Sequence, residues 1–272
     1  MANLIYFFLI KIPIFFLNIF FLKNLLYIRH DNCFVKYFKK IVMRINDKIV
    51  LTDEEIGDDH ISTSDITPIR DDAFDKSDEE KISIIQKHVK EIMLTLGLDL
   101  TDDSLRGTPK RIAKSYVNEL FYGLNPKNKP KAATFDNKYN YSEMLVEKDI
   151  TLYSTCEHHF LPIVGKAHIA YISSGNVIGL SKMNRIVEYY AKRPQVQERL
   201  TKQIVKELQE ALETDDVACV IDAKHLCVNS RGIKDVNSST VTSEFGGKFK
   251  YDNNTKDEFL KYIQLDTSFN GI

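Results

Sequence analysis

Two short runs of cysteine and histidine are the residues of this sequence whose types and spacing are best suited to chemistry. The first run, Cys-Glu-His-His, begins at Cys156, so that a thiolate and the imidazole of His159 lie three residues apart. Such a pair on a turn can bind one cation together. The second run is His-Leu-Cys, from His225 to Cys227. We interpret 217–227 as one strand, whose period of two would project His225 and Cys227 toward the same site.

Together the two runs supply up to two Cys and three His, and such a set of thiolate and imidazole donors selects zinc among the common divalent ions. If Cys156, His159 and Cys227 are the ligands, a fourth position is left for water, which is typical of a catalytic zinc. His158 and His225 then remain beside the metal as proton-transfer groups. Two alternatives stay open: a closed structural zinc that uses one of these histidines, and a Cys-x-x-His pair that binds no metal.

A third group of residues could bind an anion. The stretch Gly-Leu-Ser-Lys, from Gly179 to Lys182, meets the expected start of a helix, where free backbone N–H groups favour a phosphate. Lys182 and Arg185 share one helix face, and Arg231 has the same strand parity as the second Cys/His run. Three cations that converge near a helix start could hold a polyphosphate; alternatively, they are solvated surface residues. Glu198, in the first turn of the next expected helix, serves either the helix dipole or a ligand.

The expected secondary structure is a helical front followed by a sheet-forming body. Ser77 and Glu80 form a capping-box pattern before a helix that ends at Gly97, and a second helix opens at Thr108 with proline in its first turn. The expected strands are 144–155, 166–172, 177–180, 217–228 and 239–249, and the later helices are 181–192 and 195–212. This order suggests an antiparallel sheet with helices packed on one face, an α+β domain.

Composition places the chain among ordinary globular proteins with a core of normal size. Of its 272 residues, 43% are hydrophobic and 28% are charged, and the formal net charge is −1. This balance argues against a nucleic-acid-binding protein, which is usually strongly basic. Four cysteines are too few for a disulfide scaffold and indicate a reducing compartment or a metal.

Residues 1–42 differ from the rest of the chain. They hold eight of the sixteen phenylalanines, and an apolar run over 4–22 is long enough to span a bilayer, although Lys11, Pro13 and Asn18 interrupt it. This leader is a membrane anchor, an organelle-targeting stretch, or no part of the working protein, in which case Met43 is the true start. All but the targeting interpretation place the chemistry in the cytoplasm. Residues 43–76 are acidic and are expected to form a flexible arm.

Taken together, these motifs resemble GTP cyclohydrolase I. The matching runs are Ser-Thr-Cys-Glu-His-His from Ser154, Gly-Leu-Ser-Lys-Met-Asn-Arg from Gly179, Arg-Pro-Gln-Val-Gln-Glu-Arg-Leu-Thr from Arg193, and His-Leu-Cys with the later Arg-Gly at Arg231. The resemblance covers about residues 77–263. It implies hydrolysis of GTP at C8 of guanine, release of formate and rearrangement to 7,8-dihydroneopterin triphosphate, which begins tetrahydrofolate or pterin synthesis. It also implies a T-fold subunit in a ring-shaped homo-decamer whose sites are shared between neighbouring subunits.

The resemblance also implies roles for single residues. The ligands of a zinc ion that activates water for attack on C8 would be Cys156, His159 and Cys227. His225 resembles the acid that protonates N7 of guanine. His158 and Ser181 resemble groups that move protons during ring opening and ribose rearrangement.

The remaining residues would bind substrate. Those that look like triphosphate ligands are Lys182, Arg185 and Arg231, and those that look like guanine-binding residues are Gln197 and Glu198. The catalytic domain would then be 77–272, with the helical front over 77–123 and the T-fold body over 144–263. A zinc-stabilised binding module and a different T-fold enzyme, such as a queuosine-pathway cyclohydrolase or nitrile reductase, are the alternatives. The two spare histidines disfavour a binding module, and the metal-ligand set with the Ser-Lys cluster favours GTP cyclohydrolase I.

Overall fold

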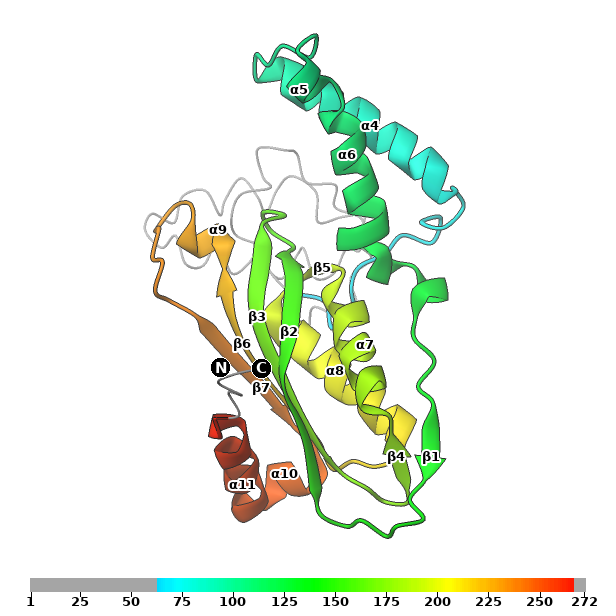
Figure 1. The fold of residues 1–272 in the computed structure, drawn as a ribbon, viewed down its shortest axis with the longest axis vertical. Helices are drawn as coiled ribbons and strands as arrows, with labels where there is room; N and C mark the ends of the chain where they lie inside the picture. The colour runs from blue at the N-terminus through cyan, green and yellow to red at the C-terminus, as the bar shows by residue number, and fades with distance from the viewer. Residues whose placement is uncertain (1–62, 267–272) are drawn as a thin grey trace, which may run out of the picture. The chain divides into compact units, whose positions relative to one another are not determined.

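The computed structural model describes residues 63–266, which from Ser64 onward belong to one compact unit (Figure 1). The predicted leader and the 43–62 part of the predicted arm lie outside the described residues. The predicted domain boundaries, and the location inferred from the leader, therefore stay predictions. Within the described chain, helices surround a mainly antiparallel sheet, so the predicted α+β class is confirmed.

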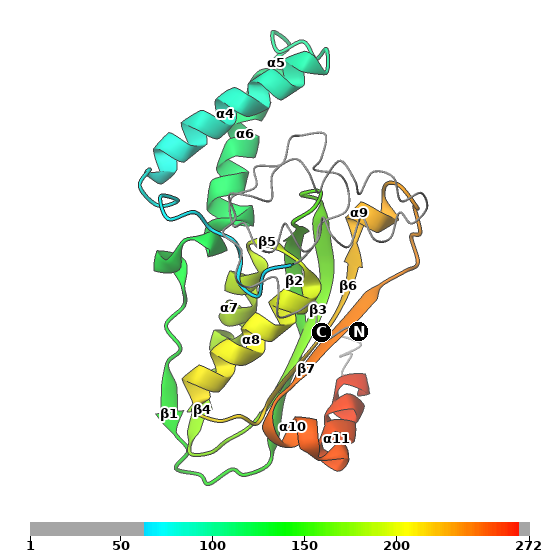
Figure 2. The same cartoon turned by 180° about the vertical axis from the view of Figure 1, so that it is seen from behind.

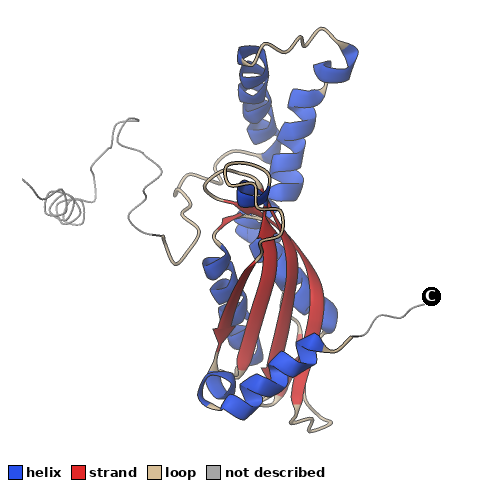
Figure 3. Ribbon diagram, turned by 90° about the vertical axis from the view of Figure 1, so that its left-hand side faces the viewer, coloured by secondary structure: helices blue, strands red, loops and turns tan. Residues whose placement is uncertain are grey.

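A five-stranded sheet in the order β5-β2-β3-β6-β7 forms the centre of the unit (Figure 3). Its strands are β5 (Pro194–Gln195), β2 (Met144–Cys156), β3 (Pro162–Ile172), β6 (Val217–His225) and β7 (Thr240–Phe245). The long strands pair antiparallel, whereas the two residues of β5 run parallel to the end of β2. A separate two-stranded sheet pairs β1 (Thr134–Asp136) with β4 (Asn176–Ile178).

Two helices, α7 (Leu180–Ala191) and α8 (Gln197–Leu212), cover one face of the large sheet, as predicted (Figure 2). They form because apolar residues recur at helical spacing, and in α8 Leu200 and Leu208 are fully buried. The facing side chains come from alternate positions of the strands, among them Cys219 of β6. This cysteine is therefore a core residue, and burial raises the pKa of its thiol.

The opposite face of the sheet is partly covered by two helices that the sequence analysis did not predict, α10 (Gly247–Tyr251) and α11 (Asn253–Gln264). Phe249 and Phe259 are fully buried there, with ring centroids 5.9 Å apart. The expected strand over 239–249 is therefore shorter than predicted, because its second half begins α10. Its apolar residues form a second, smaller core instead.

The helical front begins as predicted. Ser77 Oγ accepts a hydrogen bond from Glu80 N at 3.2 Å, and Glu80 Oε2 accepts one from Ser77 N at 2.7 Å, which completes the capping box of α4 (Asp78–Thr95). The second predicted helix is broken into shorter pieces than expected. Its pieces are α6 (Thr108–Ser115), the π-helix η2 (Tyr116–Leu120) and the 3-10 turn η3 (Tyr122–Leu124). The short helix α5 (Asp103–Arg106) precedes them, and the 3-10 turn η4 (Pro126–Asn128) follows.

The helical front is joined to the body beside β5. Gly123 N donates to Lys192 O at 3.0 Å, and Arg193 Nε donates to Gly123 O at 2.8 Å. The Arg193 guanidinium also lies 4.5 Å from the ring centroid of Tyr189 and 4.6 Å from that of Tyr190. These contacts fix the chain just before β5, whose backbone supports the site described next.

Candidate metal centre and active site

Three side chains that can bind a metal meet at one end of the large sheet. Cys156 is the last residue of β2, His159 lies in the turn to β3, and Cys227 lies in the short helix α9 (Leu226–Asn229). Their ligand atoms all lie within 4.8 Å of one another, and no other such group occurs among residues 63–266. Cys156 is buried, Cys227 is half-buried and His159 is exposed, so the group is open to solvent on its histidine side.

Backbone hydrogen bonds shape the turn that carries the first two of these side chains. Cys156 N donates to Leu161 O at 2.8 Å, and Phe160 N donates to Cys156 O at 2.9 Å. Phe160 has a φ of 52°, which closes the turn through the left-handed region. From the neighbouring strand β5, Gln195 O accepts from Glu157 N at 3.0 Å. The turn is therefore held both from within and by β5.

The third side chain reaches the group by a different route from the one predicted. We expected one strand over 217–228, with His225 and Cys227 on the same face. The strand ends at His225, which pairs with Ile163 of β3, and the next residues turn into α9. The parity argument for Cys227, and for Arg231 beyond it, was therefore wrong, because the period of two applies only to extended chain.

Arg231 nevertheless lies near the metal-binding group. Its charge lowers the pKa of the Cys227 thiol, although two larger effects, burial and the neighbouring Cys156 thiol, leave that pKa above its usual value. A bound cation would reverse this balance, because metal ligation stabilises the thiolate. Thiol protons would then be released on binding.

The donor set fits a tetrahedral metal such as zinc. With bonds of about 2.3 Å to sulfur and 2.0 Å to nitrogen, neighbouring ligand atoms of a tetrahedral zinc site lie roughly 3.5–3.8 Å apart. In this structure the three ligand atoms lie within 4.8 Å of one another, so small side-chain rotations are enough to reach that spacing. Two thiols and one imidazole would leave a coordination position open.

His225 lies beside this group and is held from behind by Gln197. The Gln197 side chain is 1% exposed, and its Nε2 faces Ile221 O at 3.1 Å, Thr240 O at 2.8 Å and Thr242 Oγ1 at 3.1 Å. Since carbonyl oxygens only accept, these contacts turn Gln197 Oε1 toward His225 Nε2, 2.8 Å away. The structure therefore places the Gln197 side-chain amide behind His225, with its NH2 group turned toward β6 and β7.

Glu198, the next residue, is exposed in the first turn of α8. Burial lowers the pKa of His225 below its usual value, and the Glu198 carboxylate opposes this effect in part. The Glu198 carboxylate therefore lies near enough to the half-buried imidazole to influence its charge. Sequence reasoning had placed both residues in the site, and the structure brings them together.

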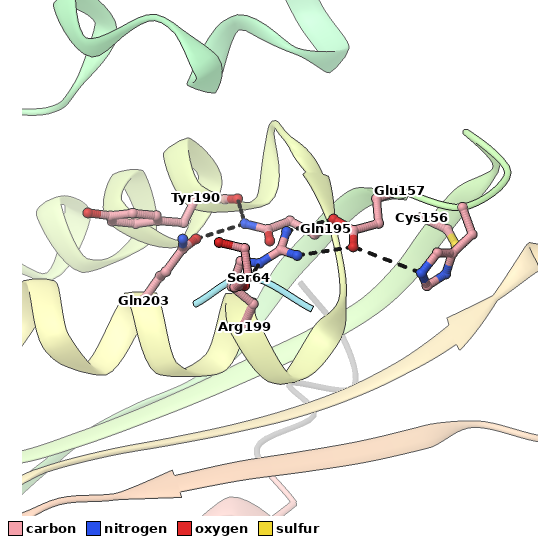
Figure 4. Close-up of polar contacts among 8 residues, drawn as sticks. Ser64, Cys156, Glu157, Tyr190, Gln195, Arg199 and Gln203 are labelled. Carbon is pink, nitrogen blue, oxygen red and sulfur yellow. Dashed lines mark hydrogen bonds and ion pairs between the residues drawn. The ribbon is translucent and has the colours of Figure 1, made fainter. Parts of the chain in front are cut away.

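Sequence reasoning missed an ion pair directly under the turn (Figure 4). Arg199 Nη1 donates to Glu157 Oε2 at 2.7 Å, and Arg199 Nη2 donates to Glu157 Oε1 at 3.0 Å. Arg199 Nε donates to Ser64 O at 2.8 Å. Both charged residues lie inside motifs that had been identified, but 42 positions separate them, and no local pattern signals that they are paired.

The predicted convergence of three cations is wrong within a single chain. Ser181, Lys182 and Arg185 open α7, which follows β4 at the far end of the sheet from α9 and β5 (Figure 1). Ile178 at the end of β4 lies 3.5 Å from the Tyr171 hydroxyl. Along β3, this tyrosine is about 27 Å from the residue that pairs with His225. Only Arg231 of the three cations lies near the metal-binding group.

The comparisons with known proteins agree with the resemblance. A family model described as GTP cyclohydrolase I matches residues 85–264. The chain is 73% identical to GTP cyclohydrolase 1 of Flavobacterium johnsoniae over 79% of this chain and 96% of that protein. It is 56% identical to GTP cyclohydrolase 1 of Vibrio parahaemolyticus over 71% of this chain and 88% of that protein. No helix among residues 63–266 is long and apolar enough to cross a membrane.

The sheet, its two covering helices and the open Cys–His–Cys group define an α+β enzyme with a candidate metal centre. The chain belongs to the GTP cyclohydrolase I family, and its fold is that family's T-fold. A different T-fold enzyme and a binding module, the two alternatives from the sequence, are thereby set aside.

Metal analysis of single variants tests the ligand set. Cys156→Ala, His159→Ala and Cys227→Ala each remove one of three ligands, so each purified protein should lose its bound divalent metal. His158→Ala and His225→Ala remove neighbours of the group, so both should retain the metal. Elemental analysis of the five proteins by mass spectrometry gives the answer. Loss of metal from His225→Ala, together with its retention in His159→Ala, would show that the ligand set is wrong.

Proposed function

We propose that this protein is a zinc enzyme that hydrolyses GTP at C8 of guanine, releases formate and forms 7,8-dihydroneopterin triphosphate, the first step of tetrahydrofolate or pterin synthesis. The observation that carries the proposal is the open three-residue group of Cys156, His159 and Cys227, with His158 and His225 beside it. Two thiolates and one imidazole favour zinc among common divalent ions. When bound, zinc would supply a Lewis acid that activates water near neutral pH.

His225 is proposed to protonate N7 of guanine. Because Gln197 Oε1 can only accept, His225 Nε2 carries a hydrogen, and Nδ1 is left as the nitrogen that exchanges a proton with substrate. Burial lowers the pKa of His225, which makes its charged form a stronger acid. Gln197 is thus proposed to act through His225, by fixing its tautomer.

His158 and Ser181 are proposed to move protons in the later steps. The exposed His158 ring lies next to Cys156, with Nδ1 3.8 Å from Cys156 Sγ, so it adjoins the position of the metal without belonging to the three-residue group. Ser181 is exposed in the first turn of α7. In a single chain these two residues lie at opposite ends of the sheet.

That separation supports a shared site in a homo-oligomer. Arg231 lies near Cys227 on this chain, whereas Ser181, Lys182 and Arg185 lie at the far end of the sheet. A triphosphate bound by all three cations therefore needs the far end of a neighbouring copy. We propose that the protein forms a ring-shaped homo-decamer in which each site takes Ser181, Lys182 and Arg185 from a neighbour.

The proposed reaction is tested by incubating the full-length, zinc-loaded protein with GTP. We expect release of formate, and a product that becomes fluorescent after oxidation and keeps its three phosphates. Mass spectrometry identifies the triphosphate, and a formate assay supplies the second product. A protein that binds zinc and GTP but forms neither product would contradict the proposal.

Glu198 is proposed to bind guanine by accepting from N1–H and the exocyclic amine, which adenine does not present together. Glu198→Gln keeps the shape but replaces one acceptor oxygen with a donor. The mispaired groups should weaken GTP binding by roughly 1–3 kcal/mol, or about 10- to 100-fold, while zinc content stays unchanged. Steady-state kinetics and metal analysis measure both effects. Unchanged kinetics would show that Glu198 does not bind guanine and only interacts favourably with the dipole of α8.

Mixing two inactive variants tests the shared site. Lys182→Ala and His225→Ala should each be inactive alone, because each lacks one half of every site. When the two chains are co-expressed, about a quarter of the sites should combine an intact His225 from one chain with an intact Lys182 from its neighbour. We therefore expect GTP turnover up to about a quarter of the wild-type value.

The matched control for this experiment is a mixture of Cys156→Ala with His225→Ala. Both residues lie at the same end of one chain, so no site in the mixture has both intact, and activity should not return. If the mixture of Lys182→Ala with His225→Ala also recovers no activity, although its oligomers are shown to contain both chains, the shared site is ruled out.

A further inference from the structure

The Glu157–Arg199 ion pair lies directly beside His158. Glu157 Oε1, which accepts from Arg199 Nη2 at 3.0 Å, is also 3.9 Å from His158 Nε2. On the other side of the imidazole ring, His158 Nδ1 lies 3.8 Å from Cys156 Sγ. The two ring nitrogens of His158 therefore face Cys156 Sγ on one side and the Glu157 carboxylate on the other.

The position of that carboxylate is fixed from behind. Arg199 has a side chain that is 3% exposed, and its Nη1 and Nη2 groups bond the two carboxylate oxygens separately. Its Nε donates to Ser64 O at 2.8 Å (Figure 4). Because the guanidinium is planar, contacts on all three nitrogens fix its plane, and the fork-like pairing passes that orientation to the carboxylate.

We propose that Glu157 and Arg199 are positioning residues for His158, and that the backbone at Ser64 locks the pair. The inference rests on the proposed function, in which His158 moves protons. A carboxylate fixed at both oxygens is a fixed negative charge 3.9 Å from His158 Nε2, and it favours the ring orientation in which that nitrogen faces it. The segment that precedes the helical front thus contributes to the geometry of the site.

Stability alone does not explain a pair of this kind. The cost of removing two charges from water offsets most of their attraction, so a well-packed apolar pair would stabilise the fold as well. A comparable pair elsewhere on α8 provides a control: Glu207 lies 2.6 Å from Lys129 Nζ and accepts from the Tyr190 hydroxyl at 2.7 Å. This second pair is about 12 Å further along the helix from Arg199.

A double-mutant cycle on the full-length, zinc-loaded protein tests the proposal. Glu157→Gln should lower kcat for GTP by about 10- to 100-fold, with zinc content and KM nearly unchanged. In the His158→Ala background the same substitution should cause no further loss, because its effect passes through His158. Glu207→Gln should lower kcat little in either background. An equal loss from Glu157→Gln in both backgrounds, or a loss of zinc, would overturn the proposal.

A second readout does not depend on turnover. Carbethoxylation of His158 by diethyl pyrocarbonate, followed by peptide mass spectrometry, should be several-fold faster in Glu157→Gln and in Arg199→Lys, since the fixed carboxylate beside Nε2 is lost or released. The rate in Glu207→Gln should match the wild type. If Glu157→Gln does not fold, we use the double variant Glu157→Gln/Arg199→Gln instead. It removes both charges of the pair, so no unpaired charge stays buried. Unchanged rates in all variants would overturn the positioning role, whether or not the protein acts on GTP.

Discussion

The register of three neighbouring strands is the constraint on which the site depends. β2 ends at Cys156, a tight turn leads into β3, and the second residue of β3, Ile163, pairs with His225 at the end of β6. A shift of one residue would turn every side chain of a strand to the opposite face. The buried alternate residues of the core hold the register, and the register in turn brings two distant motifs to one edge of the sheet.

Around that edge, buried polar side chains hold half-buried ones. Gln197 fixes His225, and Arg199 fixes Glu157, which faces His158. Both supporting residues come from the first turn of α8, so one helix start orients the neighbours of the metal-binding group from two sides. Precise placement of this kind needs a rigid base, and the core between α8 and the sheet supplies it.

The sequence was sufficient for the features that depend on local pattern: the α+β class, the capping box of the first helix and the family. It was insufficient where local pattern is ambiguous. An apolar run does not reveal that extended chain stops at His225, because a single helical turn has too few residues to show a period. Local pattern also does not show at which end of the sheet a helix begins, and the helix start that carries Lys182 is one example. It does not show that Glu157 pairs with Arg199 either.

The central claim is a metal held by three protein ligands with one position left open. X-ray absorption at the zinc edge of the zinc-loaded, full-length protein measures this first shell directly. The account predicts two sulfur neighbours at about 2.3 Å, one imidazole nitrogen at about 2.0 Å and one oxygen that is not from the protein. A shell with two imidazoles and no such oxygen would contradict it, because His158 or His225 would then be a ligand and the site would be closed.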